Sequence, residues 1–165
     1  MNSILFKMLK HAKNISIVGA HCDIPCKIYD PMIAQVASLS VVRLLDIMEE
    51  ISGHTAPSLS DQNTLSRCII RKEKEAEKVK KEIRVIWGDY FKTPHFDAFP
   101  EIHDLSHGIM QKASACKQGI QRKDGEELVN LVNRFAEIFW ETKGVKTITR
   151  ECPYPPHLKT VYLEH

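Results

Sequence analysis

The sequence predicts an all-α protein folded as an antiparallel four-helix bundle. Four long stretches carry apolar residues at helical spacing. The connections between these stretches are short and contain glycine or proline, and almost no segment shows the alternation typical of a strand. A chain of 165 residues is long enough for one domain with a buried core.

The first helix is expected over residues 31–51, because Pro31 suits a first helical turn. Its apolar stripe is Ile33, Ala37, Val41, Leu44 and Met48. Residues 53–59 are typical of a loop. The second helix is expected over residues 61–91 and should end before Pro94, because the residue before a proline avoids helical backbone. Its stripe is Leu65, Cys68, Val79, Ile83, Ile86, Trp87 and Tyr90.

The third helix should begin near Pro100 and end at Gly119. Its stripe is Ile102, Leu105, Ile109, Ala113 and Cys116. Asp124 and Glu127 have the spacing of a capping box and predict the start of the fourth helix, which Gly144 stops. Its stripe is Leu128, Leu131, Val132, Phe135, Ile138 and Phe139. Residues 145–165 are expected to form an extended C-terminal tail.

Composition excludes several classes of protein. The net charge is +2 and no basic stripe is visible, which argues against a nucleic-acid binder. No apolar run approaches the roughly 18 residues that a membrane span needs. Five irregularly spaced cysteines do not suggest a disulfide scaffold. Reduced thiols in a cytoplasmic location are therefore expected.

Residues 1–20 differ from the rest of the chain. They contain three lysines and no acidic residue, and they end in the small residues Gly19 and Ala20. Because lysines interrupt each apolar stretch, a secretory signal peptide does not form. We interpret residues 1–20 as a removable leader peptide; the alternative is an N-terminal arm that stays attached.

The next six residues, His21-Cys22-Asp23-Ile24-Pro25-Cys26, predict a metal-binding hook. Pro25 argues against a helix here, so the segment should turn tightly and bring its two thiolates together. A structural zinc site commonly uses four side-chain ligands from two clusters, and no second cluster is visible. Planar ligation by nitrogen and thiolate suits nickel or copper instead.

A free amine at His21 would complete this ligand set. The amine and the deprotonated amide of Cys22 would form a chelate ring, and the two thiolates would complete a square plane beneath the His21 imidazole. Before cleavage at Ala20 the same nitrogen is a peptide amide, which is a far poorer donor. Such anionic ligands stabilise a higher oxidation state and favour a redox enzyme. The alternatives are a non-catalytic nickel or copper binding helical bundle, and a helical interaction protein with an incidental cysteine pair.

Residues 21–31, HCDIPCKIYDP, resemble the hook of nickel-containing superoxide dismutases, whose pattern is His-Cys-Asp-x-Pro-Cys-Gly-x-Tyr-Asp-Pro. Residues 85–105 and 138–144 also resemble that family, so the similarity extends from residue 21 to about residue 144. The resemblance implies a domain of hook plus bundle over 21–144. It implies disproportionation of superoxide to oxygen and hydrogen peroxide by Ni(II)/Ni(III) cycling, with one nickel ion per subunit. It also implies a homohexamer and a leader-processing peptidase.

The same resemblance implies roles for individual residues. Asp23 would orient the hook, and Tyr29 and Tyr90 would line the approach to the open axial face of the metal. Lys92 would lie near the hook and favour an anionic substrate. The implied nickel ligands are His21, Cys22 and Cys26.

The sequence departs from the family pattern at three positions. Lys27 replaces the glycine after the second cysteine, and Ala37 and Glu75 replace a glutamate–arginine pair that supports the axial histidine in some members. At 100° per residue, Lys72 and Glu75 lie on the apolar stripe of the second helix and should be buried. Buried charges need partners. Either these two residues pair with each other, or Glu75 accepts a hydrogen bond from the His21 imidazole.

The remaining cysteines and histidines favour structural interpretations. Cys68 and Cys116 lie on apolar faces and should be buried thiols. His103 and His107 have the i, i+4 spacing of a metal pair, but no third ligand is evident. We therefore expect His103 and His107 to be hydrogen-bonded or solvated side chains and not metal ligands.

Overall fold

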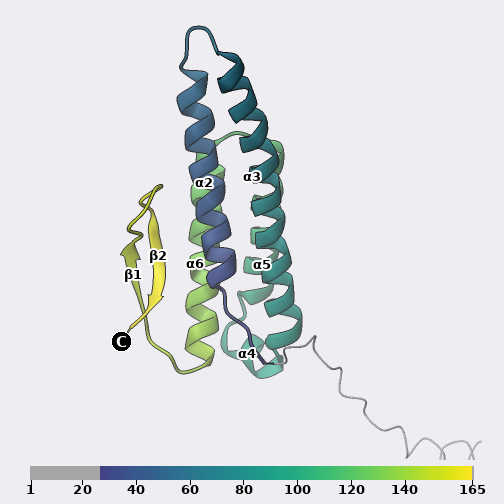
Figure 1. Ribbon diagram of the computed structural model, residues 1–165. Helices are drawn as coiled ribbons and strands as arrows, with labels where there is room; N and C mark the ends of the chain where they lie inside the picture. Colours follow the sequence, from purple (N-terminus) through teal and green to yellow (C-terminus); the bar gives the residue numbers. More distant parts are fainter. Residues whose placement is uncertain (1–26, 165) are drawn as a thin grey trace, which may run out of the picture.

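The computed structural model describes residues 27–164, and helices make up most of them. Four long helices lie side by side, namely α2 (Met32–Ser52), α3 (Leu59–Val85), α5 (Ile102–Gln118) and α6 (Arg122–Thr142) (Figure 1). Helices α2 and α5 each contact both α3 and α6, so the four surround one core. Along the chain, each long helix runs opposite to the one before it (Figure 1).

Most of the core comes from the apolar stripes that the sequence predicts, but the predicted inward positions of Ile33 and Trp87 are wrong, since these residues are 41% and 37% exposed. Among the positions predicted to be apolar and inward, several are fully buried: Val41, Val79, Ile83, Ile109, Leu128, Val132, Phe135 and Phe139. Burial of one such side chain contributes about 1.5–3 kcal/mol relative to exposure. Burial of the four stripes therefore holds the helices together.

Within residues 27–164, no helix combines the length and the apolarity that crossing a bilayer requires.

Helix α3 begins as a capping box, whereas α6 does not. Ser58 Oγ accepts a hydrogen bond from the backbone N–H of Asp61, and the Asp61 carboxylate accepts one from the backbone N–H of Ser58. The predicted capping box of Asp124 and Glu127 is wrong. Both carboxylates bind Lys112 of α5 instead, at 2.9 and 2.8 Å. Hydrogen bonds to Glu127 and Asp124 raise the pKa of Lys112.

The second predicted helix has two parts where one was expected. Helix α3 passes into a π-helical turn, η2 (Ile86–Tyr90), in which the Phe91 N–H donates to the Ile86 carbonyl 3.3 Å away. A short helix, α4 (Thr93–Ala98), follows directly. The predicted break before Pro94 is confirmed.

A small antiparallel sheet corrects the all-α prediction. Strand β1 (Thr147–Glu151) pairs with β2 (Lys159–Leu163) beside α6 (Figure 1). Two buried amides hold this hairpin to the helices. Gln35 of α2 donates to the Val161 carbonyl at 3.0 Å, and Asn133 of α6 donates to the Lys159 carbonyl at 2.8 Å. The fold is therefore mainly helical with one two-stranded sheet in the described part of the chain.

Lys72 is a buried cation that joins α3 to the end of α5. Its side chain is 2% exposed, and its ammonium donates to the carbonyls of Cys116, Lys117 and Gly119 at 2.5, 2.9 and 2.7 Å. Carbonyls at a helix C-terminus lack intrahelical partners and carry partial negative charge. Burial lowers the pKa of Lys72. The predicted burial of Lys72 is confirmed. The alternative in which Lys72 pairs with Glu75 is wrong, because the Lys72 ammonium donates its three hydrogen bonds to the carbonyls.

We expect Lys72→Met to lower the free energy of unfolding by about 1–3 kcal/mol, because three buried carbonyls lose their donor while the aliphatic stem remains. Lys74→Met, on the exposed face of the same helix, should change it by less than about 0.5 kcal/mol. Chemical denaturation followed by circular dichroism measures both. Equal effects of the two substitutions would contradict the capping role of Lys72.

Candidate functional site

The predicted metal ligands lie just before the described part of the chain. His21, Cys22, Asp23 and Cys26 fall outside residues 27–164. The described chain begins at the end of the helices where α2 starts and where α4 lies (Figure 1). We call this the hook end, because the predicted hook joins the folded part there.

The described residues do not supply a metal site of their own. Among residues 27–164, no group of three or more histidine, cysteine, aspartate or glutamate side chains could hold a metal ion. The His103 ring is hydrogen-bonded to Trp87 at 3.2 Å and stacks on Phe96 with 4.2 Å between ring centroids. The structural interpretation of His103 is therefore confirmed. A metal bound by three such side chains therefore requires residues outside 27–164.

Two tyrosines that were predicted to line the site meet at the hook end. Tyr29 precedes α2 and Tyr90 ends η2, and their ring centroids are 5.8 Å apart. The Tyr90 ring also packs on Phe139 of α6 at 4.7 Å and on Phe91 at 5.2 Å. Phe91 and Phe139 are buried, so the Tyr90 ring rests on the core. The chain that leaves the hook is thus attached to a fixed aromatic group.

Further contacts hold Tyr90 in place, and the sequence did not predict them. Its hydroxyl lies 2.8 Å from Thr142 Oγ1, and the Lys143 ammonium lies 4.7 Å from its ring centroid. The His95 ring stacks on it at 5.3 Å with an interplanar angle of 11°. The only sequence signal was the resemblance of residues 138–144 to the family. Three of these residues, Phe139, Thr142 and Lys143, contact Tyr90 from the end of α6.

Two lysines bring positive charge to this end of the molecule. Lys92 is exposed, lies two residues after Tyr90, and donates its backbone N–H to His95 Nδ1 at 3.2 Å. Lys143 is also exposed and lies over the Tyr90 ring. Clustered positive charge raises the local concentration of small anions.

Glu75 has a partner on its own helix. It is 5% exposed, which confirms its predicted burial, and its carboxylate binds Arg71 at 2.5 Å. It lies 15 residues before Tyr90, which is about 22 Å along a helix at 1.5 Å per residue. The contact between Glu75 and the His21 imidazole stays a prediction, since His21 lies outside the described residues. Ala37, the other departure, is fully buried in the core.

Lys27 adopts the backbone conformation that glycine favours. Its φ angle is +70°, in the left-handed region. The family glycine at this position therefore matches the turn that this chain makes with a lysine. The left-handed conformation costs a non-glycine residue about 1 kcal/mol.

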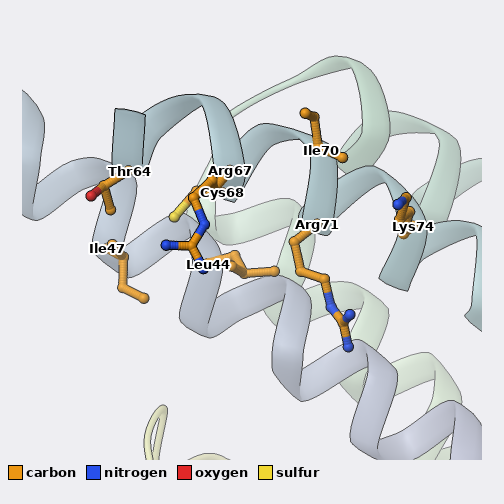
Figure 2. Close-up of a pocket in the computed structure, with 8 residues that line it drawn as sticks. All are labelled: Leu44, Ile47, Thr64, Arg67, Cys68, Ile70, Arg71 and Lys74. Atoms are coloured by element: carbon orange, nitrogen blue, oxygen red, sulfur yellow. The ribbon is translucent and has the colours of Figure 1, made fainter. Parts of the chain in front are cut away.

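A separate groove of about 470 Å³ lies between α2 and α3 (Figure 2). It is nearer the loop that joins these helices than the hook end, and its lining residues are Leu44, Ile47, Thr64, Arg67, Cys68, Ile70, Arg71 and Lys74. Burial raises the pKa of the Cys68 thiol, so this cysteine stays protonated at neutral pH. We therefore do not assign the groove to the predicted metal site.

Comparisons with known proteins identify the family of this chain. The sequence profile of nickel-containing superoxide dismutase matches residues 16–143. The proteins named superoxide dismutase [Ni] from Streptomyces coelicolor and Streptomyces seoulensis are each 36% identical over 126 residues, covering 76% of this chain and 90% of theirs.

Solved structures of nickel superoxide dismutases are also similar to this chain. A native nickel superoxide dismutase has a TM-score of 0.63 at 35% identity, covering 74% of this chain and 99% of that chain. A structure with nickel ligation corresponding to the oxidised state has a TM-score of 0.64 at 35% identity, covering 75% and 99%. Strands β1 and β2 lie beyond the matched profile. The chain belongs to the nickel-containing superoxide dismutase family.

Proposed function

We propose that this chain, a nickel superoxide dismutase by its family, disproportionates superoxide at a nickel ion held by residues 21–26. The observation that carries this proposal is the contact between Tyr29 and Tyr90. Tyr29 follows Cys26 by three residues, so its packing on Tyr90 brings the hook to the end of the helices that carries Lys92 and Lys143.

The proposed nickel ligands are the amine and imidazole of His21, the amide of Cys22, and the thiolates of Cys22 and Cys26, with one nickel ion per subunit. This donor set suits nickel, because thiolate and nitrogen ligands favour its planar coordination. When bound, nickel supplies a one-electron couple between its divalent and trivalent states. Two superoxide ions and two protons then yield oxygen and hydrogen peroxide.

The surrounding residues control access and charge. The half-buried rings of Tyr29 and Tyr90 leave an approach suited to a small substrate. The ammonium groups of Lys92 and Lys143 attract superoxide, which is an anion. Asp23 orients the hook.

The complete arrangement is a four-helix bundle with an N-terminal hook, assembled as a homohexamer in the cytoplasm. A peptidase removes residues 1–20 and frees the His21 amine. In this arrangement Glu75 accepts a hydrogen bond from the His21 imidazole.

Removal of the leader tests the amine ligand directly. A nickel-loaded chain that starts at His21 should consume superoxide, and the nickel-loaded full-length chain should be at least about 100-fold slower, since a change of 2.7 kcal/mol in activation free energy already gives that factor. Stopped-flow decay of superoxide measures both rates. Equal rates would contradict ligation by the His21 amine.

Cysteine variants separate the enzyme from a metal-binding protein without activity. Cys26→Ser in the processed chain should abolish superoxide consumption and leave the helical circular dichroism unchanged, because side chains of residues 27–164 form the hydrophobic core that holds the helices together. Cys68→Ser is the matched control, and we expect it to lower stability while activity remains. Full nickel binding by the processed wild-type chain without superoxide consumption would favour the alternative, a nickel- or copper-binding helical protein.

The turn at Lys27 predicts a stabilising substitution. Lys27→Gly should raise the free energy of unfolding of the nickel-loaded protein by about 1 kcal/mol, because glycine adopts a positive φ without strain. Lys27→Ala controls for the lost charge and should bring no comparable gain. Chemical denaturation of the loaded protein compares them. A gain shared by both variants would show that charge, and not backbone conformation, is responsible.

A further inference from the structure

The end of α6 holds the group that lines the proposed approach to nickel. Tyr90 ends the π-helical turn, and its ring packs on Phe139 one turn before the last residue of α6. Its hydroxyl lies 2.8 Å from the hydroxyl of Thr142, the last residue of α6. The next residue, Lys143, lies over the same ring. The end of α6, from Phe139 to Lys143, therefore contacts both the hydroxyl and the ring of Tyr90.

The hydrogen bonds at the end of α6 determine which hydroxyl donates. In a continued α-helix the Lys143 N–H would reach the Phe139 carbonyl, but here it donates to the Trp140 carbonyl at 3.0 Å. The Thr142 hydroxyl donates to the Phe139 carbonyl at 2.7 Å. A threonine hydroxyl carries one proton. Thr142 therefore accepts from Tyr90, and the phenol proton points into α6.

The ring of Tyr90 is held as well as its hydroxyl. The Lys143 ammonium lies 4.7 Å from the Tyr90 centroid and 5.0 Å from the Phe139 centroid, within the range of a cation–π interaction. His95 stacks on the Tyr90 ring at 5.3 Å. The lysine side chain is exposed, so its charge stays near solvent while its position is fixed by the two rings.

We propose that Thr142 and Lys143 are positioning residues for Tyr90: Thr142 holds the phenol as a hydrogen-bond donor to α6, and Lys143 keeps a positive charge over its ring. This inference rests on the proposed place of Tyr90 at the approach to nickel. Tyr90 then offers only lone pairs of its oxygen to a group that approaches from outside. Its proton, which is bound to Thr142, is then not one of the two that hydrogen peroxide needs.

Tyrosine vibrational spectra test the direction of the hydroxyl without measuring activity. The intensity ratio of the tyrosine Fermi doublet in ultraviolet resonance Raman spectra distinguishes a phenol that donates a hydrogen bond from one that accepts. The Tyr90 signal of the nickel-loaded enzyme is isolated by subtracting the spectrum of the matched Tyr90→Phe variant. Wild type and Thr142→Ser should show a donor. Thr142→Val, which has the same shape without the hydroxyl, should lose the donor signature; an unchanged ratio would overturn the proposal.

Kinetics test the consequence for turnover. Loss of the hydrogen bond in Thr142→Val should lower kcat/KM for superoxide about threefold to tenfold, and Thr142→Ser should stay within about twofold of wild type. The melting temperature of each variant checks that the fold is intact. Equal kcat/KM in folded Thr142→Val and wild type would contradict the positioning role. If wild type consumed no superoxide, the proposed function would fail, while the Raman comparison would still decide this inference.

The charge of Lys143 has its own readout. Lys143→Met should lower kcat/KM and make it less sensitive to ionic strength, because one steering charge is lost. Lys143→Arg should retain both properties. Lys146→Met, which removes an exposed lysine beyond the end of α6, is the matched control. An identical salt dependence in Lys143→Met and Lys146→Met would contradict a specific role for Lys143.

Discussion

The packing of Tyr90 between α6 and the segment that follows the hook is the contact on which the site depends. Its ring touches Tyr29, which precedes α2, and buried Phe139 of α6, and its hydroxyl binds Thr142. The π-helical turn makes this possible, because it accommodates an extra residue before the chain leaves α3. A short segment that holds a metal gains a fixed position when the residues directly after it pack on such a group.

Elsewhere in the fold, buried polar side chains join elements to one another through hydrogen bonds. Lys72 takes the free carbonyls at the end of α5, and Gln35 and Asn133 hold the β-hairpin against α2 and α6. The polar atoms would weaken the core if they lacked partners, since an unsatisfied buried group costs about 1–3 kcal/mol. With partners, they fix how the helices and the hairpin lie against one another. Lys72 binds the C-terminal end of α5, which lies away from the hook end, so its contribution to stability is separate from the proposed site.

Helical periodicity predicted the elements whose structure is set locally. It also predicted burial of Lys72 and Glu75, because position on a helix fixes which face a residue occupies. Their partners could not be predicted, since carbonyls of another helix and the neighbouring Arg71 compete for them. Three further features depend on tertiary contacts that leave little periodic signal in the sequence. They are the π-helical turn, the ion pairs of Lys112 with two carboxylates, and the two five-residue strands. For the site, the family resemblance implied Tyr29 and Tyr90, whereas Thr142 needed the geometry of α6.

A crystal structure of the nickel-loaded chain that starts at His21 tests most directly whether the metal lies beside Tyr90. We expect nickel bound by His21, Cys22 and Cys26, with the Tyr29 and Tyr90 rings beside its open face and the Tyr90 hydroxyl still bound to Thr142. Anomalous scattering at the nickel edge would locate the metal without assumptions about its ligands. Nickel at His103 and His107, or at a hook that turns away from Tyr90, would contradict the central claim.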